Sequence, residues 1–346
     1  MTALALALGI DQGLTTAVPG YTEALQNRIE RSSVAQRELA KLRRTGDQAA
    51  LAADGTAPVA PELQGIVEWI NSEPLTLSEL RGRVVLIDFW TYSCVNCLRT
   101  LPHLEAWDSS YRADGLTVVG VHAPEFAFER VPDNVRAAVR KLGVRYPVAL
   151  DNDFVTWTEY ANQYWPAKYL IDRTGRVRYV HYGEGKYDET ERQIRRYLGS
   201  KVPDRGTAVA DRTPTVRTTP ESYLGYERLA RFVGSRVVAG KESTYRFPLS
   251  LPPDHLAYAG RLRVEGERIV TGAGAGLRLR FLAREVNLVL GGRGTVQVLL
   301  DGRRRSTVAI RGEPRLYNLL RRPRLAEGVL ELRFTPGLSA YAFTFG

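Results

Sequence analysis

The chain has 346 residues, 44% of them hydrophobic and 25% charged, and its formal net charge is +10 at pH 7 with a pI of about 9.7. Its length allows about two domains with cores of their own, which excludes a generally disordered protein. A basic chain can bind nucleic acid, but Arg and Lys are spread along both halves without an aromatic-basic motif, so we expect no nucleic-acid partner.

Residues 1–60 predict no compact domain. The apolar run in MTALALALGI is too short to cross a bilayer, which takes about 20 residues, and it lacks the basic start of a signal peptide. Between residues 21 and 44, leucine and isoleucine recur at partly helical spacing among many charges, which predicts an amphipathic helix. Small residues and prolines follow without periodicity and indicate a linker.

Residues 61–200 alternate between strand and helix patterns, which predicts an α/β domain. The expected elements are a buried strand at 83–90, a helix at 96–112, a strand at 116–123, a helix at 134–143, a strand at 146–150, a hairpin at 167–183 and a helix at 187–200. The hairpin is expected to turn at Thr174 and Gly175.

A second domain with a different pattern follows. Residues 201–222 are rich in Pro, Thr and Arg and have no apolar periodicity, which predicts a linker and a domain boundary. Residues 223–346 form short alternating runs divided by Gly, Pro and Asp-Gly turns. This pattern is typical of an all-β sandwich of the jelly-roll kind.

The only two cysteines, Cys94 and Cys97, follow the first buried strand. One pair cannot build a disulfide framework, and a lone CxxC makes a poor zinc site, so we expect no metal. Cys94 lies where the strand ends and Cys97 one turn into the helix, close enough to bond, and a helix N-terminus stabilises a thiolate. A redox pair and an inert local disulfide therefore both remain open. In a redox pair, Cys94 would attack and Cys97 would resolve the mixed disulfide.

The segment from Trp90 to Pro102, WTYSCVNCLRTLP, preceded by VVLID, resembles the thioredoxin active-site segment. In detail it is similar to the TlpA/ResA-like, DipZ-type extracytoplasmic thioredoxins, and the similarity extends over about residues 60–200. The resemblance implies a thioredoxin-like fold and a thiol:disulfide oxidoreductase. It also implies no cofactor other than the redox-active disulfide between Cys94 and Cys97.

The resemblance implies a separate role for each of several residues. Asp88 matches the buried acid that relays a proton to and from Cys97, with a strand aspartate facing water as the alternative. Pro102 matches the proline inside the active-site helix, and Pro166 matches the cis-proline opposite the cysteines. Glu125 matches an acid that tunes the pair.

Aromatic and basic side chains also surround the motif. The rim of the site, where substrate would bind, is expected to be lined by Trp90, Tyr92 and Trp165, with core packing as the alternative for Trp90. Arg99 either assists the thiolate electrostatically or is a solvated surface residue. His103 and His122 are expected to be structural or solvated and not catalytic bases.

The resemblance also implies partners and a location. DipZ-type proteins often join a CcdA-like membrane electron carrier to an extracytoplasmic thioredoxin-like domain, and the N-terminal stretch resembles the exit from that carrier's last helix. We therefore expect an extracytoplasmic chain, tethered through a domain absent from it, which accepts electrons from a CcdA-like donor and reduces envelope proteins. The C-terminal domain resembles a carbohydrate-binding-like module, which makes a cell-wall glycan a further expected partner.

Two other functions remain open. Thr91 stands three residues before Cys94, as in the T-x-x-C of peroxiredoxins, although Ile87 replaces the proline of that motif, so a thiol peroxidase is the first alternative. The second is a non-catalytic envelope protein that binds glycan and keeps a structural disulfide. All five Trp precede residue 166, so the candidates for a sugar platform are Tyr226, Tyr245, Tyr258, Tyr317 and Tyr341.

Overall fold

The computed structural model describes residues 57–346 except residues 201 and 207. The predicted helix at 21–44 and the apolar N-terminal run lie outside the described residues. The described residues divide into two compact units, one ending at Arg217 and the other beginning at Thr218. We call them the first unit and the second unit. Among the described residues, none of the helices combines the length and apolar composition needed to cross a membrane.

The first unit is built on a six-stranded sheet in the order β1-β4-β3-β2-β5-β6. Its strands are β1 (Trp69–Ile70), β2 (Val84–Trp90), β3 (Leu116–His122), β4 (Val148–Leu150), β5 (Ala167–Ile171) and β6 (Val177–Tyr182). The central strand β2 runs parallel to β3 and antiparallel to β5. All seven residues of β2 are buried, as expected for a strand covered on both faces.

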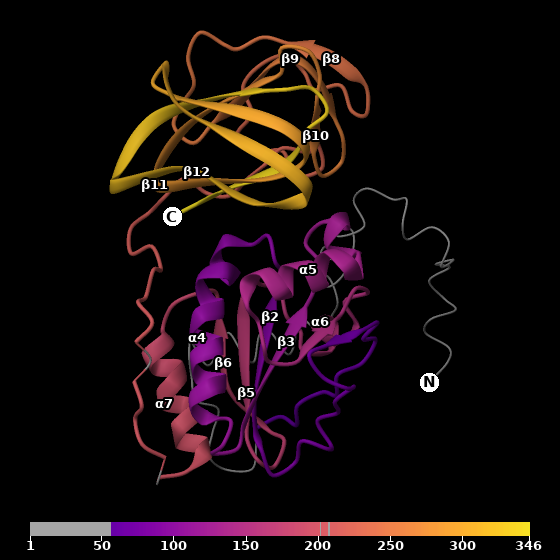
Figure 1. Ribbon diagram of the computed structural model, residues 1–346, viewed down its shortest axis with the longest axis vertical. Helices are drawn as coiled ribbons and strands as arrows, with labels where there is room; N and C mark the ends of the chain where they lie inside the picture. Colours follow the sequence, from indigo (N-terminus) through magenta and orange to yellow (C-terminus); the bar gives the residue numbers. More distant parts are fainter. Residues whose placement is uncertain (1–56, 201, 207) are drawn as a thin grey trace. The chain divides into compact units, whose positions relative to one another are not determined.

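The helices of this unit are α4 (Val95–Tyr111), a 3-10 turn (Ala127–Arg130), α5 (Pro132–Leu142), α6 (Val155–Glu159) and α7 (Tyr187–Leu198). Figure 1 shows α4 and α7 side by side, and Trp107 and Tyr111 of α4 both donate to Glu191 of α7. The order and direction of these strands and helices confirm the predicted thioredoxin-like α/β fold. The predicted hairpin is also confirmed, because β5 and β6 pair as antiparallel strands. The sequence did not predict the short elements β1 and α6.

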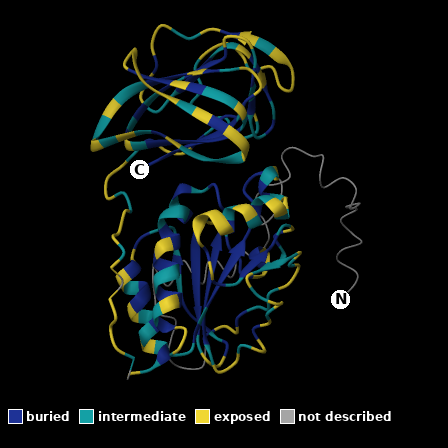
Figure 2. Cartoon of the chain, viewed as in Figure 1, coloured by how far each residue is buried: buried dark blue, intermediate teal, exposed yellow. Residues whose placement is uncertain are grey.

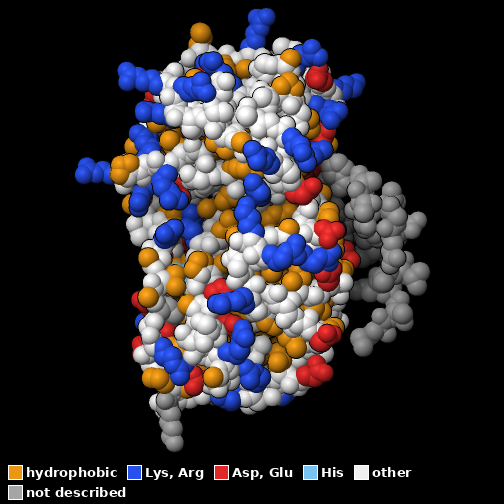
Figure 3. All heavy atoms as spheres, in the orientation of Figure 1, with side chains coloured by type: hydrophobic (Ala, Val, Ile, Leu, Met, Phe, Trp, Pro, Cys, Tyr) orange, Lys and Arg blue, Asp and Glu red, His pale blue; other side chains and the backbone are white. Residues whose placement is uncertain are grey.

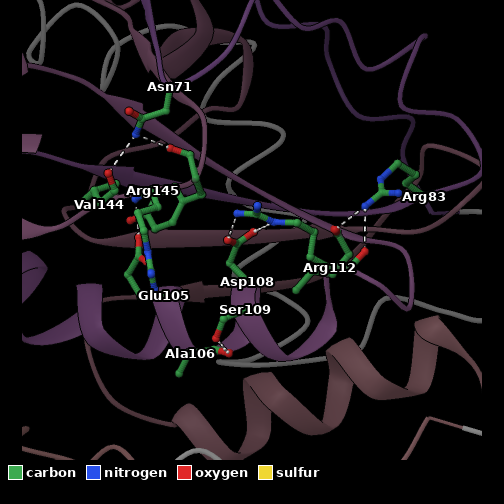
Figure 4. A network of polar contacts seen from close by, with 11 residues as sticks. Asn71, Arg83, Glu105, Ala106, Asp108, Ser109, Arg112, Val144 and Arg145 are labelled. Atoms are coloured by element: carbon green, nitrogen blue, oxygen red, sulfur yellow. Dashed lines mark hydrogen bonds and ion pairs between the residues drawn. The ribbon is translucent and has the colours of Figure 1, made fainter. Parts of the chain in front are cut away.

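Polar side chains tie the sheet together at the end where β2 begins (Figure 4). The Arg83 guanidinium donates to Thr117 Oγ1 and to the Leu116 carbonyl, each at 2.6 Å. The Asn71 amide donates to the carbonyls of Val144 and Tyr146 at 2.9 and 3.0 Å. The Arg83 bonds fix the amino ends of β2 and β3, and the Asn71 bonds join the end of β1 to the segment that leads into β4. The opposite edge, where the parallel strands end and α/β sites form, carries the cysteine loop.

The second unit is one antiparallel sheet in the order β12-β11-β13-β10-β9-β8, with β7 paired to β13. Its strands are β7 (Ser222–Tyr223), β8 (Glu242–Tyr245), β9 (Leu256–Val264), β10 (Ile269–Thr271), β11 (Gly276–Leu300), β12 (Arg303–Phe334) and β13 (Ser339–Phe345). The long strands β11 and β12 pair through several bulges, and β11 also pairs with β9 and β13. Figure 2 shows its buried residues along these strands. The predicted all-β domain is confirmed.

The segment expected as a linker, residues 201–222, bonds to a unit at each of its ends. The Arg205 side chain pairs with Asp114 of the first unit. Thr219 donates its N–H to the Leu282 carbonyl of the second unit at 2.9 Å, and Ser222 belongs to β7. The second unit therefore begins several residues before the expected boundary at residue 223.

Candidate redox site

The two cysteines lie at the start of α4 and differ in exposure. Cys94 is the N-cap of the helix, and its sulfur accepts the Cys97 N–H at 3.3 Å. Cys94 is partly exposed, whereas Cys97 is completely buried, and both are thiols in this structure. Burial, reinforced by the Cys94 thiol, raises the pKa of Cys97 well above its usual value. Cys94 is therefore the more accessible sulfur of the pair.

Asp88 lies in the centre of β2 and is completely buried, so the alternative of a solvent-facing aspartate is wrong. Strand alternation places its side chain on the same face as Leu86 and Trp90, which pack in one cluster with Cys97. Neither carboxylate oxygen has a hydrogen-bond partner among the described residues. Burial raises the pKa of Asp88 to about 7, although the positive charge of Lys168 opposes this rise.

Lys168 is a functional candidate that the sequence analysis missed. It stands directly opposite Asp88 in the pairing of β2 with β5, and its side chain is completely buried. The ammonium donates to the Gly183 carbonyl at 3.2 Å and lies 5.8 Å from the centre of the Tyr187 ring. Burial lowers the pKa of Lys168, and Asp88 opposes this shift. A basic residue two positions after Pro166 is a sequence signal of a role near the cysteines. Only the strand register, however, shows that it is paired with Asp88.

The Trp165–Pro166 peptide bond is cis, which confirms that prediction. β5 begins directly after Pro166, and its first residue, Ala167, pairs with Phe89 near the end of β2. Pro166 therefore lies at the edge of the sheet from which the cysteine loop departs. Trp165 is partly exposed and donates its indole N–H to the Ala123 carbonyl at 3.0 Å.

Trp90 does not line a rim, and this prediction is wrong. Its side chain is completely buried in the core cluster that contains Cys97. A Cβ atom on Gly120 would lie 2.9 Å from Trp90 Nε1, so glycine at this position of β3 leaves the space that the indole occupies. Tyr92, expected beside it, is only 6% exposed and stacks on His122 with ring centres 5.8 Å apart.

Two histidines near the motif, His103 and His122, are buried rings and not exposed bases. Burial lowers the pKa of His122 to about 3 and that of His103 to about 4, so both are neutral at physiological pH. His103 stacks on Tyr187 with ring centres 3.5 Å apart, and neither of its nitrogens has a hydrogen-bond partner among the described residues. Both side chains therefore serve as packing groups, in line with the expectation from the sequence.

A second buried carboxyl, Glu129, was also missed by the sequence analysis. It accepts hydrogen bonds from the Ser93 N–H and hydroxyl at 3.2 and 2.7 Å, and from the N–H groups of Glu125 and Phe126 at 2.7 and 3.0 Å. Burial and the nearby Glu125 raise its pKa to about 7. Glu129 thus joins the residue before Cys94 to the loop after β3. Glu125, the predicted tuning acid, is buried in that same loop.

Arg99 is not a solvated surface residue. Its guanidinium donates to both carboxylate oxygens of Glu184 at 2.6 and 2.7 Å, and both side chains are 11% exposed. The same guanidinium donates to Asn96 Oδ1, between the two cysteines, at 2.7 Å. The bidentate pair holds a positive charge beside the start of α4, where it interacts with Cys94.

The tyrosines of the second unit offer little open surface for a sugar. Tyr245, Tyr258 and Tyr341 are at most 4% exposed and are packing residues. The Tyr317 hydroxyl accepts the Arg311 N–H at 3.2 Å, which leaves Tyr226, at 39% exposed, as the open candidate among the five. In the described ranges, 57–200, 202–206 and 208–346, no three His, Cys, Asp or Glu side chains group so that they could hold a metal ion.

Comparison with known proteins finds two family models. One described as the AhpC/TSA family matches residues 59–180, and one described as a thioredoxin like C-terminal domain matches residues 219–346. The protein DipZ of Mycobacterium tuberculosis is 39% identical over the whole chain, which spans 52% of the length of that relative. The thiol-disulfide oxidoreductase YkuV of Bacillus subtilis is 31% identical over 40% of this chain and 93% of its own length.

More distant similarities fall on the first unit's part of the sequence. The thiol-disulfide oxidoreductase ResA of Halalkalibacterium halodurans is 27% identical over 40% of this chain and 74% of its own length. The crystal structure of a thioredoxin-like superfamily protein superposes with a TM-score of 0.40 at 28% identity, covering 42% of this chain and all of that one.

Proposed function

Because the chain belongs to the thioredoxin-like thiol:disulfide oxidoreductases of the DipZ type, we propose that it is a reductant that acts outside the cytoplasmic membrane on protein disulfides. The chain spans about half the length of its DipZ relatives, so the whole protein's electron path is part of this proposal. The observation that carries the proposal is the contrast between a partly exposed Cys94 and a completely buried Cys97.

This contrast assigns a separate step to each sulfur. The Cys94 thiolate attacks a substrate disulfide, which releases one substrate thiolate and leaves a mixed disulfide on Cys94. Cys97 then gives up its proton, and its thiolate attacks the Cys94 sulfur. The second substrate thiolate leaves, a Cys94–Cys97 disulfide forms, and the substrate has gained two electrons. A dithiol donor must return these electrons before the next cycle.

Asp88 is the proton acceptor for Cys97 in this scheme. Its pKa of about 7 suits a group that takes up and releases a proton near neutral pH. Lys168 is a positioning residue that keeps this pKa from rising further. The Arg99–Glu184 pair supports the thiolate at Cys94, and Glu125, buried in the loop after β3, is proposed to tune the cysteine pair.

Substrate is proposed to bind along the sheet edge at Pro166. Trp165, which precedes Pro166 at this edge and is partly exposed, is a proposed contact for substrate. Tyr92 contributes the small exposed part of its ring, whereas Trp90 supports the site only from the core. An extended segment of an oxidised protein would lie across these groups.

The proposed donor is a CcdA-like membrane electron carrier, and the proposed substrates are disulfide-containing proteins of the cell envelope. The support for this part is the similarity to DipZ over the whole chain. A cell-wall glycan remains a proposed ligand of the second unit, with Tyr226 as its candidate contact. Nothing beyond the Cys94–Cys97 disulfide is needed as a redox cofactor in this scheme.

The experiment that tests the function is a redox titration combined with turnover of a protein disulfide. The pair should titrate reversibly at a potential above roughly −300 mV, whereas a structural disulfide stays oxidised below this value. Cys94→Ser should abolish turnover, and Cys97→Ser should accumulate a mixed disulfide with substrate. Unchanged turnover in Cys94→Ser would contradict the mechanism.

A thiol peroxidase is the second candidate, because the AhpC/TSA model matches residues 59–180. Against it, the Thr91 hydroxyl lies 3.4 Å from His122 Nε2 in the buried interior, and Ile87 stands where the peroxiredoxin proline is expected. Rapid oxidation of Cys94 by hydrogen peroxide, faster than its reaction with a protein disulfide, would favour the peroxidase.

A further inference from the structure

The net charge of the chain belongs to its second unit. Residues 219–346 contain 21 Arg and Lys against 11 Asp and Glu, whereas residues 1–218 contain 27 of each kind. The excess of +10 therefore lies in the C-terminal part, although basic residues themselves occur throughout the chain. Figure 3 shows many Lys and Arg side chains and few Asp or Glu on the visible face of this unit.

Much of the charge that no ion pair neutralises lies on β11 and β12. Between residues 293 and 324 the only acidic residues are Asp301 and Glu313. Arg321 pairs with Glu285. The other arginines of this stretch form no ion pair with a described residue, and they are Arg293, Arg303, Arg304, Arg305, Arg311, Arg315, Arg322 and Arg324.

Three of these arginines share the outer face of one hairpin. Arg293 on β11 stands directly opposite Arg311 on β12, and both are exposed. The alternation of side chains places Arg293 outward, because Val296 and Val298 of the same strand are buried. Arg304 donates to Thr307 Oγ1 at 2.8 Å. Thr307 on β12 is paired with the exposed Gln297 on β11, so Arg304 lies on the same outer face.

We call Arg293, Arg304 and Arg311 the arginine face. Arg304 and Arg311 are separated along β12 by about 23 Å at roughly 3.3 Å per residue. Like charges directly opposite each other on neighbouring strands destabilise a sheet. The pair formed by Arg293 and Arg311 therefore destabilises this unit, and a bound anion would offset that destabilisation. A ligand that carries several negative charges over this length fits the face.

The residue types indicate phosphate. Of the 21 basic residues in 219–346, 20 are Arg, and guanidinium groups bind phosphate oxygens in a bidentate manner. Readers of single-stranded nucleic acid stack bases on aromatic rings, but this part of the chain has no Trp. The nearby Tyr317 ring is covered by the Arg315 guanidinium at 4.9 Å, and its hydroxyl is bonded to the backbone of Arg311.

We propose that the arginine face binds the phosphate headgroups of an anionic lipid bilayer. The choice of lipid over other phosphate carriers rests on the proposed function, which sets the chain beside a membrane electron donor. Each arginine near an anionic bilayer strengthens binding about fivefold. The three residues of the face together strengthen binding about 125-fold, and this electrostatic contribution is sensitive to salt.

The test measures binding of the full chain to vesicles of phosphatidylglycerol mixed with phosphatidylcholine, and to phosphatidylcholine alone. Binding should require phosphatidylglycerol and should disappear at about 1 M salt, where the Debye length is about 3 Å. The double variant Arg293→Gln/Arg311→Gln should bind about 25-fold more weakly. The matched control is Arg236→Gln/Arg246→Gln, which removes the same charge from two exposed arginines outside the face.

The control should stay much closer to the unaltered chain, and an equal loss in both variants would overturn the assignment to this face. Absence of binding to anionic vesicles would overturn the proposal. Binding to polyphosphate or nucleic acid but not to vesicles would also overturn it, in favour of a different polyanion. Disulfide turnover measured on the same preparations tests the function separately, because a failed redox assay leaves the vesicle result intact.

Discussion

The two units differ in whether they bury or expose their ionisable side chains. The first unit has Asp88, Glu129 and Lys168 at 0% exposure inside its core. In the second unit, the one buried ionisable side chain apart from tyrosines in the described residues is Glu331, at 8% exposed, and it is bonded to Arg278 and Arg333. Buried charges are costly, so a fold keeps them where their chemistry is used. The comparison separates a unit that reacts from a unit that presents charge.

Among variants that keep both cysteines, replacement of Asp88 by Asn should give the largest effect. This change removes the proposed proton acceptor for Cys97, and general-base assistance typically raises a rate by about 10² to 10⁴. Because the pKa of Asp88 is about 7, the rate of the unaltered protein should rise as the pH passes through 7, and the variant should lose this rise. Stopped-flow measurement of the resolving step between pH 5 and 9 checks this.

The matched control for Asp88→Asn is Asp133→Asn, which makes the same change at an exposed position on α5. Its rate should equal that of the unaltered protein. If Asp88→Asn kept both the rate and its pH dependence, the buried acid would have only a structural role, and the contrast between the units would lose its chemical meaning.

Lys168→Met should shift the pH dependence without abolishing the reaction. Removal of the ammonium takes away the attraction that holds the pKa of Asp88 down, so that pKa should rise further above its usual value. Neighbouring charges typically shift a pKa by about 1 to 3 units, so the rate at pH 6 should fall by about tenfold or more. The same pH-rate measurement, with recovery of the rate at high pH, checks this.

A Lys168→Met variant that is slower by the same factor at every pH would contradict this role. Lys168→Arg is a useful companion, because it keeps the charge while enlarging the side chain. If the charge matters, Lys168→Arg should restore the position of the pH curve as far as the core accommodates it.

Glu129→Gln should destabilise the first unit by about 1–3 kcal/mol, since the amide cannot accept all the donors that converge on this carboxyl. The pKa of Glu129 is raised to about 7 from 4.5, so the folded state binds its proton more tightly than the unfolded state. This group's stabilising contribution is full below pH 4.5 and decreases as the pH rises to about 7. Urea unfolding should therefore show a cost that is largest at about pH 4.5 and below and that shrinks as the pH approaches 7.

A cost for Glu129→Gln that grows with pH would mean that the carboxylate form holds the loop. The reactivity of Cys94 with an alkylating agent provides an independent readout. It should change in Glu129→Gln if Ser93 is displaced, and it should stay constant if Glu129 only stabilises the loop after β3.

The sequence predicted the parts of the redox site that lie within one continuous motif. Asp88, Cys94 and Cys97 lie within one continuous run of strand, loop and helix. The local pattern and the resemblance were sufficient to place them. The cis bond before Pro166 was also predicted, because the resemblance extends to that segment. Trp90 was placed wrongly because the motif does not show that Gly120 on the neighbouring strand makes room for the indole.

The missed residues depend on contacts between distant segments. Lys168 meets Asp88 through strand register across 80 residues, and Glu129 meets Ser93 through a loop 36 residues away. Neither pairing has a local pattern. The arginine face has the same origin, because Arg293 and Arg311 are opposed only once β11 and β12 are paired. Composition showed the charge, but only the fold showed where it is unneutralised.

The smallest effect is expected for an exposed ion pair of the second unit. Arg261 donates to Glu242 at 2.9 Å, and the two side chains are 57% and 51% exposed. Such pairs typically contribute about 0.2–1 kcal/mol, because water and salt screen them. Arg261→Gln should therefore lower the free energy of unfolding of the second unit by less than about 1 kcal/mol. Urea unfolding at low and high salt should show that even this difference fades as salt is added. A loss above about 2 kcal/mol, independent of salt, would show that the second unit also relies on specific charge pairs, and the division between a reacting unit and a charge-presenting unit would have to be redrawn.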